Sequence, residues 1–174
     1  MTLRLGYQIP NFSYGTGVDA LFPTVVAQAK EAEAAGFDTV LVMDHFYQLP
    51  GIGTPDQPML ECYTTLGALA SATSTIQLSS LVTGNTYRNP AILAKTVTTL
   101  DVVSAGRAIL GIGAGWFEKE HLDYGIEFGT FTDRFVRLEE ALNIITPMLR
   151  GENLADAADT APSRRHVRTR LPSP

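Results

Sequence analysis

Four short runs of apolar residues recur along the chain, at intervals of about 30 residues, the length of one strand–helix unit. Each run is almost continuously apolar, which is typical of strands buried on both faces, as in a parallel sheet that helices cover. We therefore expect four strands of this kind. They span residues 3–9, 39–43, 76–82 and 108–112.

Helical patterns occupy the segments that follow these runs. Asn89-Pro90 predicts a helix start, because asparagine caps helices well and proline at the first helical position loses no hydrogen bond. Apolar residues then recur three and four positions apart as far as Gly106, a typical helix stop. The same spacing begins after Thr132 and ends at Gly151. The expected helices span residues 23–35, 60–73, 90–105 and 133–150.

The order is a strand followed by a helix, four times, with an extra helix after the fourth strand. This alternation predicts an α/β fold with a parallel sheet, either a (β/α)8 TIM barrel or an open sheet of the flavodoxin type. Periodicity alone does not choose between them. A complete barrel takes about 250 residues, whereas this chain has 174. A barrel here would be a partial one, with about four strand–helix units.

The character of the chain changes after Gly151. Residues 152–174 hold small polar residues followed by arginines and prolines, with no apolar run for a fifth strand. We expect one domain over residues 1–151 and an unstructured basic tail over 152–174. A nucleic-acid-binding arm is the alternative for this tail, but it has no aromatic residues on which bases could stack.

Composition narrows the class of protein. The chain is 45% hydrophobic with a formal net charge of −5, and this acidic balance argues against a nucleic-acid partner. The single cysteine, Cys62, cannot form an internal disulfide, and we expect it to be a small buried residue rather than a nucleophile. No apolar stretch approaches the ~20 residues of a membrane span. These features predict a cytoplasmic protein without a membrane partner.

Polar and glycine-rich groups follow three of the expected strands. The second strand runs into Asp44-His45-Phe46, the third into Thr83-Gly84-Asn85, and the fourth into residues 111–116. Because parallel strands present their carboxyl ends at one rim, we expect these groups to form a small-molecule site. Asp44 and His45 are the catalytic candidates, since histidine exchanges a proton near neutral pH. A structural histidine, bonded to its neighbours, is an equally weighted alternative.

Residues 111–121 allow several interpretations. Glycines at 111, 113 and 115 let the backbone approach a flat ring or a phosphate, but Trp116 breaks the G-x-G-x-x-G spacing of a dinucleotide site. The single Glu118-x-x-His121 pair has no second copy that would complete a metal site. We expect Glu118, Glu120 and His121 to be solvent-exposed helix charges, and Trp116 and Phe117 to be buried.

The motifs of this chain, taken together in order and spacing, resemble the luciferase-like monooxygenase family over residues 3 to about 151. Residues 111–116, with Glu120-His121 and Tyr124-Gly125, are similar to the actinobacterial branch that uses the deazaflavin coenzyme F-420. The other motifs that carry the resemblance are residues 6–11, 33–38, 44–47, 83–90 and 100–107.

The resemblance implies an oxidoreductase that transfers hydride, built as a (β/α)8 barrel with a tricyclic ring at its carboxyl-terminal rim. The implied cofactor is F-420, with FMN, and an FMN-dependent monooxygenase, as the alternative. His45 matches the active-site histidine of several deazaflavin dehydrogenases, with Asp44 near the ring. Ser80-Leu81 matches a non-prolyl cis peptide behind the ring. The implied cofactor-binding residues are Ser80, Leu81, Thr83, Gly113, Ala114 and Gly115.

Departures from the family limit these expectations. The sugar-phosphate dehydrogenases of the branch have glutamate where this chain has Trp116 and tryptophan where it has Leu49, so that activity is not expected. The family binds cofactor phosphate largely through its second half-barrel, and the end of this chain reads as truncated or frame-shifted. A non-catalytic half-barrel fragment or assembly subunit is therefore a competing hypothesis. Its open strand edges predict a homo-oligomer. The sequence predicts a small-molecule substrate but does not identify it.

Overall fold

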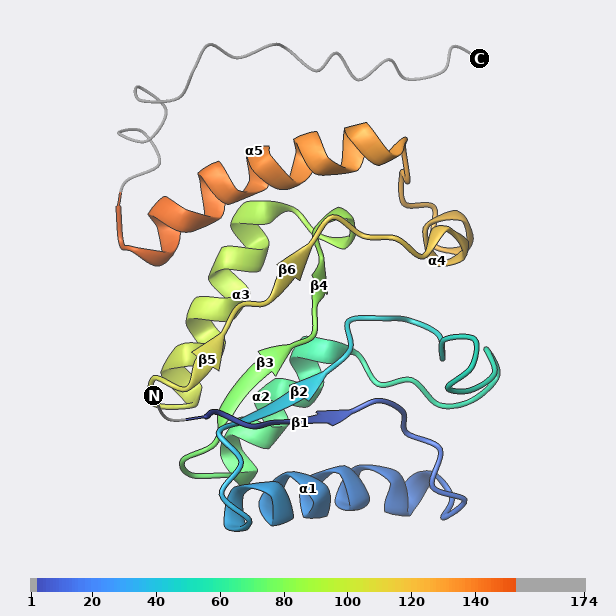
Figure 1. The fold of residues 1–174 in the computed structure, drawn as a ribbon, viewed down its shortest axis with the longest axis vertical. Helices are drawn as coiled ribbons and strands as arrows, with labels where there is room; N and C mark the ends of the chain where they lie inside the picture. The colour runs from blue at the N-terminus through green and yellow to red at the C-terminus, as the bar shows by residue number, and fades with distance from the viewer. Residues whose placement is uncertain (1–2, 153–174) are drawn as a thin grey trace.

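The computed structural model describes residues 3–152, and the expected tail lies outside them apart from Glu152. Strands and helices alternate as expected (Figure 1). The strands are β1 (Gly6–Ile9), β2 (Thr39–Val42), β3 (Gln77–Ser80), β4 (Thr83–Gly84), β5 (Ala108–Ile109) and β6 (Ile112–Gly113). The helices are α1 (Val18–Ala34), α2 (Cys62–Ala72), the 3-10 turn η1 (Asn85–Tyr87), α3 (Pro90–Val103), α4 (Glu118–Asp123) and α5 (Phe131–Leu149).

The main sheet has four parallel strands in the order β1-β2-β3-β5. Each strand therefore pairs with the next one along the chain. A flavodoxin-like sheet would place its first strand between the second and the third. The consecutive order is that of an arc of a barrel, which confirms the expectation of a partial (β/α)8 barrel.

The third and fourth expected strands are each divided in two. β4 continues β3, β6 continues β5, and the two continuations form a small parallel sheet with Thr83 beside Ile112. A cis peptide bond joins Leu81 to Val82 at the first break. The resemblance implied this bond between Ser80 and Leu81, which is wrong by one residue. The Leu81 backbone N–H still donates to the Val42 carbonyl at 2.8 Å, so the chain leaves the β3 ladder only after Leu81.

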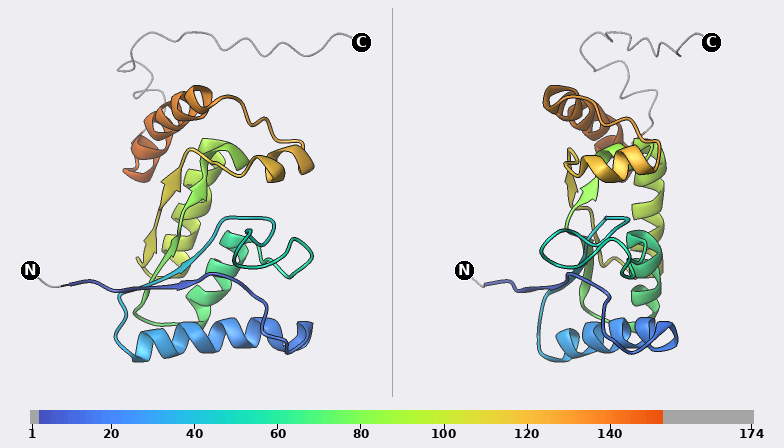
Figure 2. Two further views of the ribbon diagram at one scale, coloured as in Figure 1. Left: turned by 45° about the vertical axis from the view of Figure 1, so that its right-hand side comes forward. Right: turned by 90° about the vertical axis from the view of Figure 1, so that its right-hand side faces the viewer.

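Helices cover one face of the sheet, and the core lies between the two (Figure 2). Side chains alternate along each strand, so Val40 and Val42 of β2 point into this core and are fully buried. They pack with residues of α1, α2 and α3, among them Val25, Leu66 and Leu100. No described helix covers the opposite face of the sheet, which is the inner face of the barrel arc.

A second, smaller core fixes α5 against α3. Leu93 and Val97 of α3 pack with Ala141 and Ile145 of α5, and all four side chains are buried. Figure 1 shows α5 crossing the upper end of α3 and of the β4–β6 pair. This packing sets the first turn of α5 beside the carboxyl ends of the strands.

Two helices begin earlier than the sequence patterns predict. α1 starts at Val18 and runs through Pro23, because burial of Leu21 in its first turn stabilises the added residues. α5 starts at Phe131, because Thr130 caps it in a reciprocal pair of hydrogen bonds with Asp133. Among residues 3–152, no helix is long and apolar enough to cross a membrane.

Candidate functional site

A cavity of about 520 Å³ lies at the carboxyl ends of β2, β4 and β6. The two catalytic candidates and all the implied cofactor-binding residues except Ser80 line this cavity, whereas Phe46, Asn85, Gly111 and Ile112 of the strand-end segments do not. Because parallel strands end at one rim, side chains that lie far apart in the sequence are brought together here. The lining residues are Asp44, His45, Leu81, Val82, Thr83, Gly84, Tyr87, Gly113, Ala114, Gly115, Trp116, Phe131, Arg134 and Phe135.

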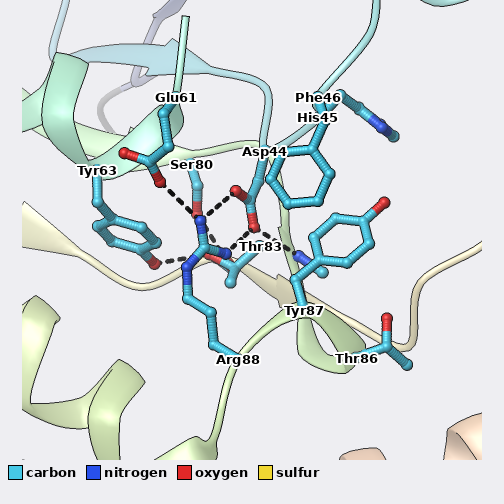
Figure 3. Close-up of polar contacts among 12 residues, drawn as sticks. Asp44, His45, Phe46, Glu61, Tyr63, Ser80, Thr83, Thr86, Tyr87 and Arg88 are labelled. Carbon is cyan, nitrogen blue, oxygen red and sulfur yellow. Dashed lines mark hydrogen bonds and ion pairs between the residues drawn. The ribbon is translucent and has the colours of Figure 1, made fainter. Parts of the chain in front are cut away.

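Ser80 lies behind the cavity wall, in a chain of buried hydroxyl groups (Figure 3). Its hydroxyl contacts the Thr83 hydroxyl at 2.6 Å and donates to the Gly111 carbonyl at 3.0 Å. The Tyr63 hydroxyl contacts the same Thr83 oxygen at 2.7 Å, and burial raises the pKa of Tyr63 to about 12. These bonds occupy the Thr83 hydroxyl, and the Thr83 backbone N–H donates to the Gly111 carbonyl at 2.8 Å.

Asp44 is buried and fully engaged with neighbouring groups. Arg88 donates to both of its carboxylate oxygens, at 2.6 and 2.8 Å, and the Gly84 backbone N–H donates at 3.0 Å (Figure 3). Arg88 also donates to Glu61 at 2.8 Å and lies over the Tyr63 ring. Burial alone would lower the pKa of Arg88, but its bonds to Asp44 and Glu61 raise it above the ordinary value. Asp44 therefore ties the end of β2 to the segment before α3.

His45 is held by a carboxylate from a distant part of the chain. Its Nδ1 lies 2.9 Å from Oε2 of Glu120, and the Glu120 side chain has no exposed surface. The backbone N–H groups of Phe46 and Tyr47 donate to Oε1 of Glu120 at 2.6 and 3.0 Å. The Tyr87 hydroxyl donates to Oε2. The prediction that Glu120 is a solvent-exposed helix charge is wrong, because α4 turns this residue toward the loop after β2.

The hydrogen bonds of Glu120 also decide its ionisation. Burial on its own would raise the pKa of Glu120, but the bonds from His45, Tyr87 and the Tyr47 backbone together lower it. The pKa of Tyr87 is raised above its ordinary value, by burial and by the bond to Glu120. At neutral pH this pair is a carboxylate and a neutral phenol.

His121, beside Glu120, was also expected at the surface and is fully buried. Its Nδ1 lies 2.9 Å from the Phe117 carbonyl, which can only accept, so Nδ1 carries the hydrogen. Its Nε2 then accepts from the Thr86 hydroxyl at 2.7 Å. Gly115 packs against this pair with φ +83°, and a Cβ there would lie 2.7 Å from the Thr86 hydroxyl. His121 thus supports the glycine loop.

Within residues 3–152, no cluster of potential metal ligands occurs.

Aromatic side chains form the outer wall of the cavity. Trp116 is 61% exposed, so the prediction of its burial is wrong; its ring stacks on Phe117 and meets the His45 ring edge-on at 5.8 Å. Phe131 and Phe135 of α5 also line the cavity. The apolar spacing predicted this helix, but no motif marked the residues of it that face the cavity.

Arg134 joins α5 to the glycine loop. Its Nε donates to the Gly115 carbonyl and its Nη1 to the Gly129 carbonyl, both at 3.0 Å, and the guanidinium lies 3.9 Å from the centre of the Phe128 ring. Sequence reasoning missed Arg134, which has no motif of its own.

Cys62 is buried and is a free thiol whose pKa burial raises, which agrees with the expected structural role.

Comparison with known proteins identifies relatives of the whole described region. The sequence model of the family described as luciferase-like monooxygenase matches residues 3–174, beyond residue 151 where the motifs end. An F-420-dependent glucose-6-phosphate dehydrogenase of Amycolatopsis mediterranei is 31% identical over 153 residues, 87% of this chain and 43% of that protein. An enzyme of the same name from Kineococcus radiotolerans is 35% identical over 144 residues, 82% of this chain and 40% of that protein.

Solved structures share the fold. An F-420-dependent secondary alcohol dehydrogenase, in complex with an F-420–acetone adduct, has a TM-score of 0.69 and 26% identity over 84% of this chain and 42% of its own. The oxygenating constituent of 3,6-diketocamphane monooxygenase from Pseudomonas putida, in complex with FMN, has a TM-score of 0.68 and 23% identity over 85% of this chain and 40% of its own. The chain thus spans about two fifths of the length of these proteins.

Proposed function

This chain belongs to the luciferase-like monooxygenase family, and we propose that it forms the cofactor-binding part of an oxidoreductase that transfers hydride with the deazaflavin coenzyme F-420. The observation that carries the proposal is the cavity at the strand ends, whose lining includes the catalytic candidates and all the implied cofactor residues except Ser80. The proposed unit is residues 1–151, since the described helices and strands all lie within that range.

The cavity wall suits a flat ring. Gly113, Ala114 and Gly115 present backbone with little side chain, and Leu81 and Val82 lie on the same wall. A Cβ on Gly113 would lie 3.0 Å from Val82, so glycine there keeps the space open. We assign Thr83 and the backbone of residues 113–115 to ring contact, with Ser80 supporting Thr83 from behind.

The bound coenzyme would accept or donate the hydride. His45 would hold the proton that accompanies hydride transfer and exchange it with the substrate, since its imidazole lines the same cavity. Asp44 would keep the loop after β2 in place through Arg88. Trp116 would cover the ring or the substrate from the exposed side of the cavity.

FMN is the second candidate cofactor, and an FMN-dependent monooxygenase the corresponding activity. The FMN-bound relative supports it through the shared fold alone, whereas the two relatives described above, at 31% and 35% identity, are named as F-420-dependent. We do not extend their sugar-phosphate activity to this chain, because Trp116 and Leu49 stand where that branch has glutamate and tryptophan. We assign a small molecule as the substrate and no nucleic-acid or membrane partner. We place the protein in the cytoplasm.

A non-catalytic half-barrel is the competing function. The observation that favours it is the open inner face of the sheet, which no described helix or strand covers. Under this hypothesis the chain folds and pairs with another half-barrel but does not bind a coenzyme alone.

Titration of the purified 174-residue chain with F-420 and with FMN tests the proposal. We expect saturable binding of F-420, followed by its absorption and fluorescence, and weaker binding of FMN, which absorbs at longer wavelength. Gly113→Val should weaken binding by at least about tenfold, or about 1.4 kcal/mol, by filling the cavity wall. Gly67→Ala, in open space on α2, is the matched control. A folded chain that binds neither ring contradicts the proposal and favours the half-barrel hypothesis.

A further inference from the structure

The acceptor sites of the Glu120 carboxylate are fully used by donors. Oε1 accepts from the backbone N–H groups of Phe46 and Tyr47, and Oε2 accepts from the Tyr87 hydroxyl and lies 2.9 Å from Nδ1 of His45. A carboxylate has about four lone-pair sites, and these four contacts match them. Burial on its own would raise the pKa of Glu120, but the bonds from His45, Tyr87 and the Tyr47 backbone lower it, so the carboxyl group is ionised at neutral pH.

An ionised carboxylate only accepts hydrogen bonds, so Nδ1 of His45 must carry a hydrogen in both the neutral and the cationic ring. Only Nε2 then gains or loses a proton. Among residues 3–152, no group bonds to Nε2, whereas the imidazole itself lines the cavity. The rings of Trp116 and Phe117 meet His45 edge-on at 5.8 and 6.0 Å and restrict its rotation.

Asp44, the acidic neighbour of His45 in sequence, is not available for this role. Both of its oxygens are bonded to Arg88, and one also to the Gly84 backbone. The charged groups near His45 are therefore Glu120 in direct contact, the mutually paired Asp44 and Arg88, and Arg134, which lines the same cavity.

From this geometry we infer that Glu120, and not Asp44, is the positioning residue of His45: it fixes the Nδ1–H tautomer and makes Nε2 the nitrogen that exchanges a proton with the ligand of the cavity. The inference deepens the proposed function and rests on it for the identity of the ligand. The tautomer itself is a property of the ligand-free chain. Tyr87 assists by holding the same Glu120 oxygen.

The test is long-range proton–nitrogen NMR correlation on the 15N-histidine-labelled full chain without cofactor, at alkaline pH where imidazole is neutral. His45→Gln identifies the His45 signals. We expect the hydrogen on Nδ1 in the wild type and in Asp44→Asn. In Glu120→Gln an amide NH₂ replaces one of the two carboxylate oxygens. The Phe46 and Tyr47 backbone N–H groups still need the remaining oxygen as acceptor, so the NH₂ faces Nδ1 of His45. Because this NH₂ only donates, the hydrogen of His45 should move to Nε2. Glu118→Gln, on the exposed face of α4, is the matched control.

Wild-type His45 with its hydrogen on Nε2 overturns the inference, as does a folded Glu120→Gln variant that keeps Nδ1–H, or an inversion in Asp44→Asn. If Glu120→Gln does not fold, the inference is tested by the tautomer of His45 in the wild type and in Tyr87→Phe. Both should carry the hydrogen on Nδ1. Because no coenzyme is present, this result is independent of whether F-420 binds. In a chain that does bind it, Glu120→Gln should change the coenzyme affinity little, because Glu120 contacts His45 and is not itself part of the cavity lining.

Discussion

Asp44 and Arg88 show how a single ion pair can hold a functional loop. The Asp44 side chain is 1% exposed and that of Arg88 17%. Burying both charges costs solvation that only their mutual bonds offset, so removing one partner leaves the other charge uncompensated. The pair therefore matters more for keeping the loop after β2 in place than for net stability.

We expect Arg88→Met to destabilise the chain by about 3–5 kcal/mol, because it leaves Asp44 buried without its partner. Asp44→Asn combined with Arg88→Met should cost clearly less than the sum of the two single changes. Urea unfolding of the four proteins in a double-mutant cycle measures this difference. Additive effects would show that the two side chains act independently.

Glu33 should make stability depend on acid pH. Its Oε1 accepts from the backbone N–H groups of Ser74, Thr75 and Ile76 at 2.8, 2.5 and 2.9 Å. Burial on its own would raise the pKa of Glu33, but these bonds lower it from 4.5 to about 2. A lowered folded-state pKa gives stability that is present above the unfolded value of 4.5 and is lost as pH falls toward about 2.

The measurement is the unfolding free energy of wild type and Glu33→Gln between pH 7 and pH 2. We expect the variant to be less stable at neutral pH and the difference to shrink through the acid window. Glu31→Gln, at an exposed position of α1, is the control and should follow the wild type. A constant difference between wild type and Glu33→Gln across this range would contradict the assignment.

Individual site residues were predictable only where a general rule placed them. His45 and Thr83 follow directly after buried strands, and parallel strand ends meet at one rim, so the cavity confirms that they lie together. Glu120 was not predictable, because α4 has only six residues and shows no clear apolar period. The partners of its carboxylate also lie 33 to 75 residues away in sequence.

At the scale of elements, α5 depends on its amino-terminal cap. Thr130 accepts from the Asp133 backbone, while the Asp133 carboxylate accepts from the Thr130 backbone at 2.8 Å. The first turn of α5 also carries Phe131 and Arg134 to the cavity. The cap therefore contributes to both helix stability and the shape of the site.

Thr130→Ala should lower the unfolding free energy by about 1 kcal/mol, because the amides of the first turn lose their acceptor. Thr132→Ala, an exposed change in the same turn, should have little effect. Chemical denaturation measures both. Equal effects of the two changes would mean that the cap contributes nothing beyond helix propensity.

The order and type of the elements were predictable from apolar periodicity, while their ends were not. The break of the third strand at Leu81-Val82 is invisible in an apolar run that continues across it. Pro23 marked a helix start by its usual preference, but packing of Leu21 extends α1 past it. In α1 a tertiary contact thus overrode the local signal.

At the scale of the whole molecule, both edges of the main sheet are open within residues 3–152. In this part of the chain β1 and β5 each pair on one side only, and Ile109 of β5 is 39% exposed on the inner face. Two four-stranded arcs together have the strand number of a (β/α)8 barrel. A two-fold axis along the barrel would keep the strands parallel while β5 of each copy meets β1 of the other.

We therefore expect a concentration-dependent dimer in sedimentation of the purified chain. Ile109→Lys should shift the equilibrium toward monomer by placing a charge in the inner face. Val102→Lys, 75% exposed on α3, is the control for an added surface charge. A well-folded monomer at every concentration would contradict pairing between copies.

The consecutive strand order has a consequence for engineering. Strands that are neighbours in the sheet are also neighbours along the chain. One continuous segment of the gene therefore encodes the whole cavity wall formed by this chain, from Asp44 to Phe135. Such a sector can be transplanted by a single crossover, without circular permutation. A chimera that fuses residues 1–152 to the remainder of the Amycolatopsis relative would exchange half of its mouth in one step.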